Sequence, residues 1–133
     1  MTILITILAI LFIVLASISE AIMDTVQFHY EKSIFKFDPD KYNPLFWDAS
    51  ISWKNKYKEN SMTEEKFYGS KTIFVFTTDA WHFFKFLRNL FLFIGLPLLG
   101  IGYLNIIIAV VIARIIYGLV FTFCFDKVLI KKI

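Results

Sequence analysis

The chain has 133 residues, enough for a single domain, and 58% of them are hydrophobic. Aromatic residues make up 19% of the chain and gather in long apolar runs, which favours insertion in a membrane over a soluble globular core. The net charge of +3 is too small to indicate a nucleic-acid partner. With Cys124 as the single cysteine, an internal disulfide and a multi-cysteine metal site are excluded.

The first apolar run, residues 1–19, carries no charged side chain. A helix of that length rises about 28 Å, close to the roughly 30 Å thickness of the hydrocarbon core of a bilayer. A cleaved signal peptide is the alternative, because Ser17 to Ser19 offer small residues at its end. No Lys or Arg precedes the run, however, as a signal peptide normally requires. We predict an uncleaved span that continues as a helix to residue 31.

Residues 32–71 are polar, with turn signals at Asp38-Pro39 and Asn43-Pro44, and they are rich in aromatic residues. Disordered linkers are poor in aromatic residues, whereas Trp and Tyr prefer the membrane–water interface. We therefore predict an ordered cap on the headgroup layer. A loop that is only anchored by its aromatic side chains is the alternative. Lys54 and Lys56 in this segment are candidate headgroup-binding residues.

The apolar run from Asn89 to Phe125 is too long for one crossing of a membrane. Three glycines and a proline between Gly95 and Gly102 indicate a tight hairpin between two helices, or a kink in one helix. We predict two spans: a second span within residues 72–100 and a third span, followed by a basic tail, within residues 101–133.

The second span has two candidate starting points, at Ser70 to Thr72 and at Thr78-Asp79, because Ser, Thr and Asp cap helix N-termini. From there Asp79, His82 and Lys85 share one helix face. Arg88 follows on the same helix and is a third candidate headgroup-binding residue.

The predicted fold is therefore one all-α membrane domain over residues 1–133. It has about three transmembrane helices and an ordered, aromatic-rich interfacial loop between the first and second. In this topology the loop and the C-terminal tail lie on the same side and hold nearly all the Lys and Arg residues. The positive-inside rule then predicts a cytoplasmic loop and C-terminus, with the N-terminus outside.

In this topology the inner end of the first span meets the start of the second. Carboxylates and imidazoles on facing helices are the usual ligands of a metal site in a helical bundle, and a bound Zn²⁺ or similar divalent ion would polarise a water molecule. The candidate catalytic groups are Glu20, Asp24, Asp79 and His82. The candidate metal ligands are Asp24, His29, Asp79 and His82, and Gln27 belongs to the same group of polar side chains.

A metal-free polar network is the simpler interpretation of the same residues, with the carboxylates bonded to Lys85, Arg88 and backbone groups. No recognised metal-ligand spacing, such as His-Glu-x-x-His, is present. His29 also lies five residues after Asp24, about 140° around a regular helix. It joins the other candidates only if the helix ends or distorts before it.

Arg114 lies near the centre of the third span, where a charge costs on the order of 3 kcal/mol unless it pairs or snorkels. We predict that it faces the bundle, with Asn105, Tyr117 or a carboxylate as its partner. A snorkelling arginine, or one at a contact between copies of the chain, is the alternative.

Four stretches of the chain, residues 21–30, 43–48, 52–57 and 78–82, resemble a group of small integral membrane proteins of bacteria and phages. The resemblance covers the inner end of the first helix, the loop and the start of the second helix. It implies a membrane protein, which in a bacterium lies in the inner (cytoplasmic) membrane. It implies no activity, because none is established for the group.

The most specific function that these residues suggest is a membrane-embedded, metal-dependent hydrolase that acts on a lipid or its headgroup at the cytoplasmic face. The alternative is a non-enzymatic membrane protein, either a holin-like pore former or an accessory subunit of a membrane complex. The expected partners are the lipid bilayer and a second copy of the chain or a larger membrane complex, and not a nucleic acid.

Overall fold

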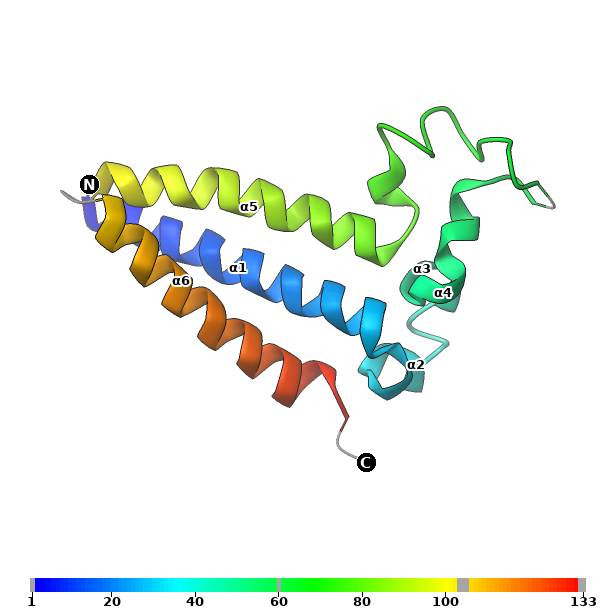
Figure 1. Ribbon diagram of the computed structural model, residues 1–133, viewed down its shortest axis with the longest axis horizontal. Coiled ribbons are helices and arrows are strands. Elements are labelled where there is room, and N and C mark those ends of the chain that lie inside the picture. The colour runs from blue at the N-terminus through cyan, green and yellow to red at the C-terminus, as the bar shows by residue number, and fades with distance from the viewer. Residues whose placement is uncertain (1, 60, 103–105, 132–133) are drawn as a thin grey trace.

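Three long helices lie side by side in the structure, a computed structural model that describes residues 2–59, 61–102 and 106–131 (Figure 1). They are α1 (Thr2–Phe28), α5 (Ala80–Gly102) and α6 (Ile106–Phe123), and α6 continues as a wider π-helical turn, η4 (Cys124–Leu129). All three are long and apolar enough to cross a membrane. The predicted all-α fold with three membrane spans is confirmed.

Short helices fill the segment between α1 and α5. They are η1 (Tyr30–Lys32), α2 (Ile34–Phe37), α3 (Pro44–Trp47), α4 (Ala49–Ser52), η2 (Trp53–Lys56) and η3 (Val75–Thr77). Asn43 and Asp48 cap α3 and α4 by accepting the backbone N–H groups of Leu45 and Ser50. Within the described residues, β-type pairing is limited to the isolated bridges Ser33–Ile130 and Tyr57–Glu65.

The antiparallel helices α1 and α5 form the principal contact of the bundle (Figure 1). Their backbones approach closely at Gly95, where an added Cβ would lie 3.0 Å from Phe12 Cβ and 3.3 Å from the Ala9 carbonyl oxygen. Small residues allow such close packing between membrane helices. The glycines and Pro97 therefore do not form the hairpin, because α5 runs through them to Gly102. The connection at residues 103–105 lies outside the described residues.

The helix α5 begins at Ala80, so the second of the two predicted starting points, Thr78-Asp79, is the correct one. Asp79 Oδ1 accepts the backbone N–H of His82 at 2.9 Å, which satisfies one of the free donors of the first turn. The alternative start at Ser70 to Thr72 is wrong, because that segment forms turns around Gly69, whose φ is +78°.

An ordered cap packs against the end of the bundle where α1 finishes and α5 begins, which we call the loop end. Phe35 and Trp47 stack with their ring centroids 4.2 Å apart, and Tyr42 meets both rings edge-on. Trp47 also lies 5.8 Å from the Phe84 ring, which joins the cap to α5. The predicted ordered, aromatic-rich loop is confirmed.

The C-terminal tail is tied to the cap as well. The Lys131 N–H donates to the Lys32 carbonyl at 2.9 Å, beside the bridge between Ser33 and Ile130. Leu129 is buried with Tyr30, Phe35 and Ala80 in the core beneath the cap. The loop and the tail therefore lie at the same end of the bundle.

Candidate functional site

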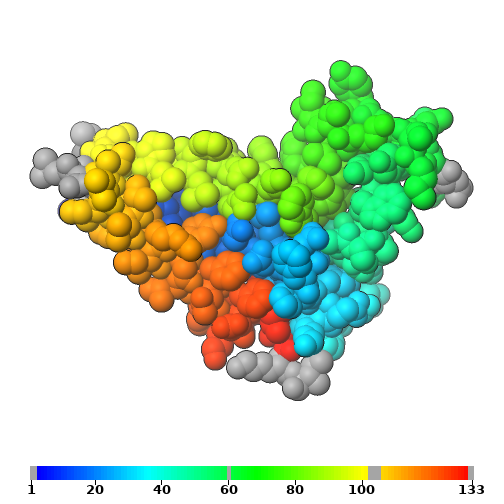
Figure 2. Space-filling model, viewed as in Figure 1, coloured from blue at the N-terminus to red at the C-terminus, as the bar shows by residue number. Residues whose placement is uncertain are grey.

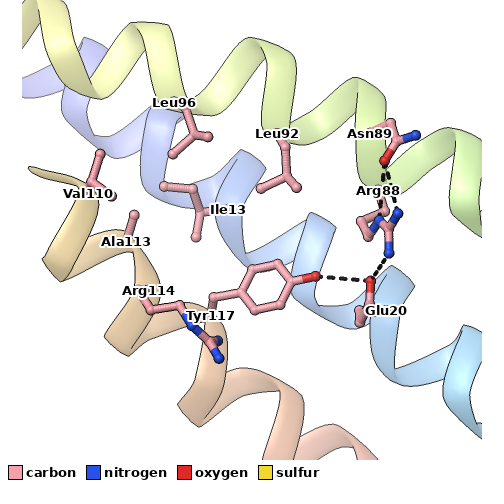
Figure 3. A pocket seen from close by; sticks show the side chains of 10 residues that line it. All are labelled: Ile13, Glu20, Arg88, Asn89, Leu92, Leu96, Val110, Ala113, Arg114 and Tyr117. Atoms are coloured by element: carbon pink, nitrogen blue, oxygen red, sulfur yellow. Dashed lines mark hydrogen bonds and ion pairs between the residues drawn. The ribbon is translucent and has the colours of Figure 1, made fainter.

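A groove follows α1 between α5 and α6 and has a volume of about 470 Å³ (Figures 2 and 3). The helices α5 and α6 flank α1 and diverge toward the loop end (Figure 1). Over their whole length they contact each other less than each contacts α1. Ten residues line it: Ile13, Glu20, Arg88, Asn89, Leu92, Leu96, Val110, Ala113, Arg114 and Tyr117. The space-filling view shows α1 at the surface between the other two helices (Figure 2).

The groove is amphipathic along its length (Figure 3). Its part farther from the loop end is apolar, lined by Ile13, Leu92, Leu96, Val110 and Ala113. The polar side chains gather toward the loop end, and they are Glu20, Arg88, Asn89, Arg114 and Tyr117.

Glu20 and Arg88 form an ion pair across the polar part of the groove, and the Tyr117 hydroxyl donates to the same carboxylate oxygen of Glu20 at 3.3 Å. Arg88 also donates to Asn89 Oδ1 at 3.2 Å. The Ser17 hydroxyl donates to the Tyr117 carbonyl at 2.6 Å and thereby strengthens the contact between α1 and α6. The pairing of Glu20 with Arg88 agrees with the simpler interpretation of the sequence, in which these polar side chains form a network without a metal.

Arg114 stands at the edge of the groove and is exposed. Its guanidinium reaches along α6 toward the loop end, with Nη1 3.9 Å from the position that a Cβ would occupy at Gly118. Gly118 thus leaves the guanidinium room to lie against the helix.

Arg114 lines the groove of the bundle, but the hydrogen-bonded partner that the sequence suggested for it is not found. Across residues 2–59, 61–102 and 106–131 no hydrogen bond or ion pair of Arg114 is found, and Asn105 lies outside those ranges. The carboxylate among the groove-lining residues, Glu20, is bonded to Arg88 and Tyr117 instead. An exposed Arg114 is compatible with both alternatives, a snorkelling arginine and one at a contact between copies of the chain.

Asp79 and His82 form a second polar centre at the first turn of α5. His82 Nδ1 lies 2.7 Å from Asp79 Oδ2, and because a carboxylate only accepts hydrogen bonds, Nδ1 carries the proton. Burial of Asp79 raises the pKa of its carboxyl, but the hydrogen bonds from the side chain and backbone of His82 outweigh burial and hold the pKa below its usual value. The imidazole is half-exposed and meets the Trp81 ring edge-on at 4.9 Å.

The predicted metal ligands Asp24, His29, Asp79 and His82 are not brought together. Within the described parts of the chain, no three His, Cys, Asp or Glu side chains are grouped closely enough to hold an ion. Asp79 and His82 are directed at each other, and α1 ends at Phe28, so that exposed His29 meets the Phe125 ring edge-on at 5.2 Å. The side chains present do not fit a divalent metal centre.

The predicted headgroup-binding residues also separate. Arg88 is paired within the bundle, whereas the ammonium groups of Lys54 and Lys56 lie over the neighbouring rings of Trp53 and Tyr57. On α5, Lys85 lies over the Trp81 ring at 4.6 Å. None of these three lysines is among the residues that line the groove.

Sequence reasoning missed Gly118 and the apolar lining of the groove. The spacing of Arg114, Tyr117 and Gly118 by three and four residues places them on one face of α6 and was the available signal. No family model, curated protein or solved structure matches the chain. The geometry of the site therefore carries the functional argument.

Proposed function

We propose that this chain is a non-enzymatic membrane protein that binds a lipid in the groove between α5 and α6. The observation that supports this proposal is the amphipathic groove itself, which is apolar along Leu92, Leu96 and Val110 and polar around Glu20 and Arg88. Its volume of about 470 Å³ lies within the range of ligand sites, roughly 300–1,000 Å³. A lipid, with its apolar acyl chain and its polar headgroup, matches this arrangement of apolar and polar side chains.

The position of the groove favours a lipid over a water-soluble ligand. Its walls are three membrane-spanning helices, so its sides face acyl chains and its polar part lies toward one surface of the bilayer. A lipid can enter it sideways from the membrane without crossing water. Lipid binding is consistent with a role of this chain as an accessory subunit, and with its assembly into a homo-oligomer or a larger membrane complex.

The orientation belongs to the same proposal. Nearly all Lys and Arg residues lie in the loop and the tail, which meet at the loop end. By the positive-inside rule this end faces the cytoplasm, and the N-terminus faces outward. With the resemblance to bacterial and phage proteins, we place the chain in a bacterial inner membrane, with the polar part of the groove in the cytoplasmic leaflet.

A bulky residue in the apolar part of the groove tests the proposal. Val110 lines the groove and Val111, its neighbour, does not, although the two are equally exposed at 51% and 52%. Val110→Trp should reduce the phospholipid that remains bound to protein purified in mild detergent, counted by native mass spectrometry. Val111→Trp adds the same side chain outside the groove and should retain it. Equal retention by both variants would refute lipid binding in the groove.

A lipid hydrolase is the second candidate, and the Asp79–His82 pair is the observation that favours it. In the neutral imidazole with its proton on Nδ1, Nε2 is an acceptor and can take a proton from a water molecule, as a general base does. His82→Gln should then abolish phospholipid hydrolysis by the purified protein, measured by release of labelled headgroup or fatty acid. Equal or absent turnover in the parent and the variant would exclude this candidate.

A further inference from the structure

Arg114 is the uncompensated charge of the groove. Three charged residues line it, and Glu20 and Arg88 neutralise each other. Arg114 is exposed and has no hydrogen bond or ion pair with any residue the structure describes. The groove therefore carries one net positive charge next to its apolar part.

The Arg114 side chain extends along α6 toward the loop end, into the polar part of the groove. Its guanidinium lies against α6 at Gly118, one turn nearer the loop end than its own backbone. The planar guanidinium fork of arginine matches two oxygens of a phosphate group. Because Gly118 has no side chain, the fork has room beside the helix.

We propose that Arg114 binds the phosphate of an anionic phospholipid, one acyl chain of which occupies the apolar part of the groove. This inference rests on the proposed lipid-binding function and names the lipid class. A lipid whose headgroup also carries an ammonium group is less favoured, because that charge would lie close to Arg114 and Arg88. Charge complementarity thus selects an anionic lipid over a zwitterionic one.

The test uses the full chain in mild detergent, titrated with phosphatidylglycerol or with phosphatidylcholine carrying the same acyl chains. Native mass spectrometry counts the lipids bound per protein and yields the affinity for each. The parent should bind phosphatidylglycerol more tightly. Arg114→Gln should weaken phosphatidylglycerol binding by roughly tenfold, as expected for loss of a charged phosphate contact, and phosphatidylcholine binding by less.

Three variants control for charge and for folding. Lys127→Gln removes one positive charge from the same end of the chain, at an exposed residue outside the groove, and should keep the preference. Gly118→Leu keeps the charge but occupies the space of the guanidinium, so it should lower the preference as Arg114→Gln does. Gly118→Ala should be tolerated, because its Cβ would meet Arg114 Nη1 at an ordinary contact distance. Unfolding temperatures without added lipid identify any variant that fails to fold.

The outcomes separate this inference from the function on which it rests. Loss of binding of both lipids in Val110→Trp would show that the groove binds lipid. If the parent and Arg114→Gln then show no preference for phosphatidylglycerol over phosphatidylcholine, the role of Arg114 is refuted. If the parent binds neither lipid, both proposals fail. If lipid is absent and Arg114→Gln instead converts a dimer to a monomer, the occupant of the groove is a second copy of the chain, which overturns the inference.

Discussion

Glu20 of α1 and Arg88 of α5 form an ion pair to which Tyr117 of α6 adds its hydroxyl, so that one carboxylate oxygen joins all three long helices. The side chains of Glu20 and Arg88 are 26% and 23% exposed, which makes this a largely enclosed pair. Removing one member of such a pair leaves a charge without its partner, and that loss costs more than the pair contributes.

Arg88→Met should therefore lower the free energy of unfolding by on the order of 3 kcal/mol. The double variant Glu20→Gln/Arg88→Met should recover part of the loss, because no unpaired charge remains. Lys85→Met serves as the control, since it removes a positive charge from the same helix at an exposed position. Denaturant unfolding in detergent measures all three. An Arg88→Met variant as stable as the parent would show that the pair does not hold the bundle together.

The contact between α1 and α5 at Gly95 leads to a second prediction. Alanine favours a helix over glycine by about 1 kcal/mol, but a Cβ at residue 95 would lie only 3.0 Å from Phe12 Cβ. Overpacking of this kind costs roughly 1–3 kcal/mol, so Gly95→Ala should be destabilising and Gly95→Leu more so.

The matched control is Gly100→Ala, because among the described residues a Cβ at that position would meet just the end of the Ile106 side chain, at 3.7 Å. This variant should be neutral or slightly stabilising in thermal unfolding. If Gly95→Ala and Gly100→Ala behave alike, the helices do not approach as closely at residue 95 as the structure indicates.

Acid should weaken the first turn of α5 through Asp79. Because the pKa of Asp79 is lower in the folded protein than its ordinary value of 3.8, the folded state holds this proton less readily than the unfolded state. The resulting stability is fully present above the ordinary pKa and is lost as the pH falls through the lowered, folded-state pKa.

The Asp79→Asn variant removes the carboxylate charge but keeps the helix cap, because asparagine also caps helices well. Between about pH 5 and about pH 3, unfolding of the parent should depend more steeply on pH than unfolding of Asp79→Asn. Asp79→Ala should lose the cap as well, at a cost of about 1–2 kcal/mol at neutral pH. Identical pH dependence in the parent and Asp79→Asn would assign the acid sensitivity to other carboxylates.

The membrane topology leads to the last prediction. The Lys131 N–H bonds to the Lys32 carbonyl, so the loop and the tail lie at the same end of the bundle. A reporter inserted after Glu59 and one fused after Ile133 should both report the cytoplasm, and a reporter at the N-terminus should report the opposite side. A loop and a tail on opposite sides would contradict the fold, and both on the outside would reverse the proposed orientation.

Several features of the fold could be predicted from local sequence. Each long apolar run is sufficient for a membrane-spanning helix whatever its neighbours are, so hydropathy and length predicted the three spans. Thr78-Asp79 marked one of two possible helix starts because capping depends on residues within a single turn. The aromatic residues of the loop likewise indicated an ordered cap, and Phe35, Tyr42 and Trp47 now pack together there.

The partners of the polar side chains could not be predicted in the same way. The spacing of four residues places Glu20 and Asp24 on one face of α1, but it does not say which residue lies opposite. That depends on how α1 and α5 are aligned along their length, and in the structure they approach closely at Gly95. In the resulting register Glu20 meets Arg88, whereas Asp79 and His82 pair with each other.

The sequence by itself determined the apolar helices, their number and the polar residues that interrupt them, because these properties depend on neighbours within a few turns. Only the tertiary structure decided that Arg114 lines a groove with no hydrogen-bonded partner among the described residues, because the groove follows from the angle between α5 and α6. This angle results from side-chain packing between helices far apart in the chain, at contacts such as that of Ser17 with Tyr117. Hydropathy is a local property of the sequence and does not determine the angle between α5 and α6.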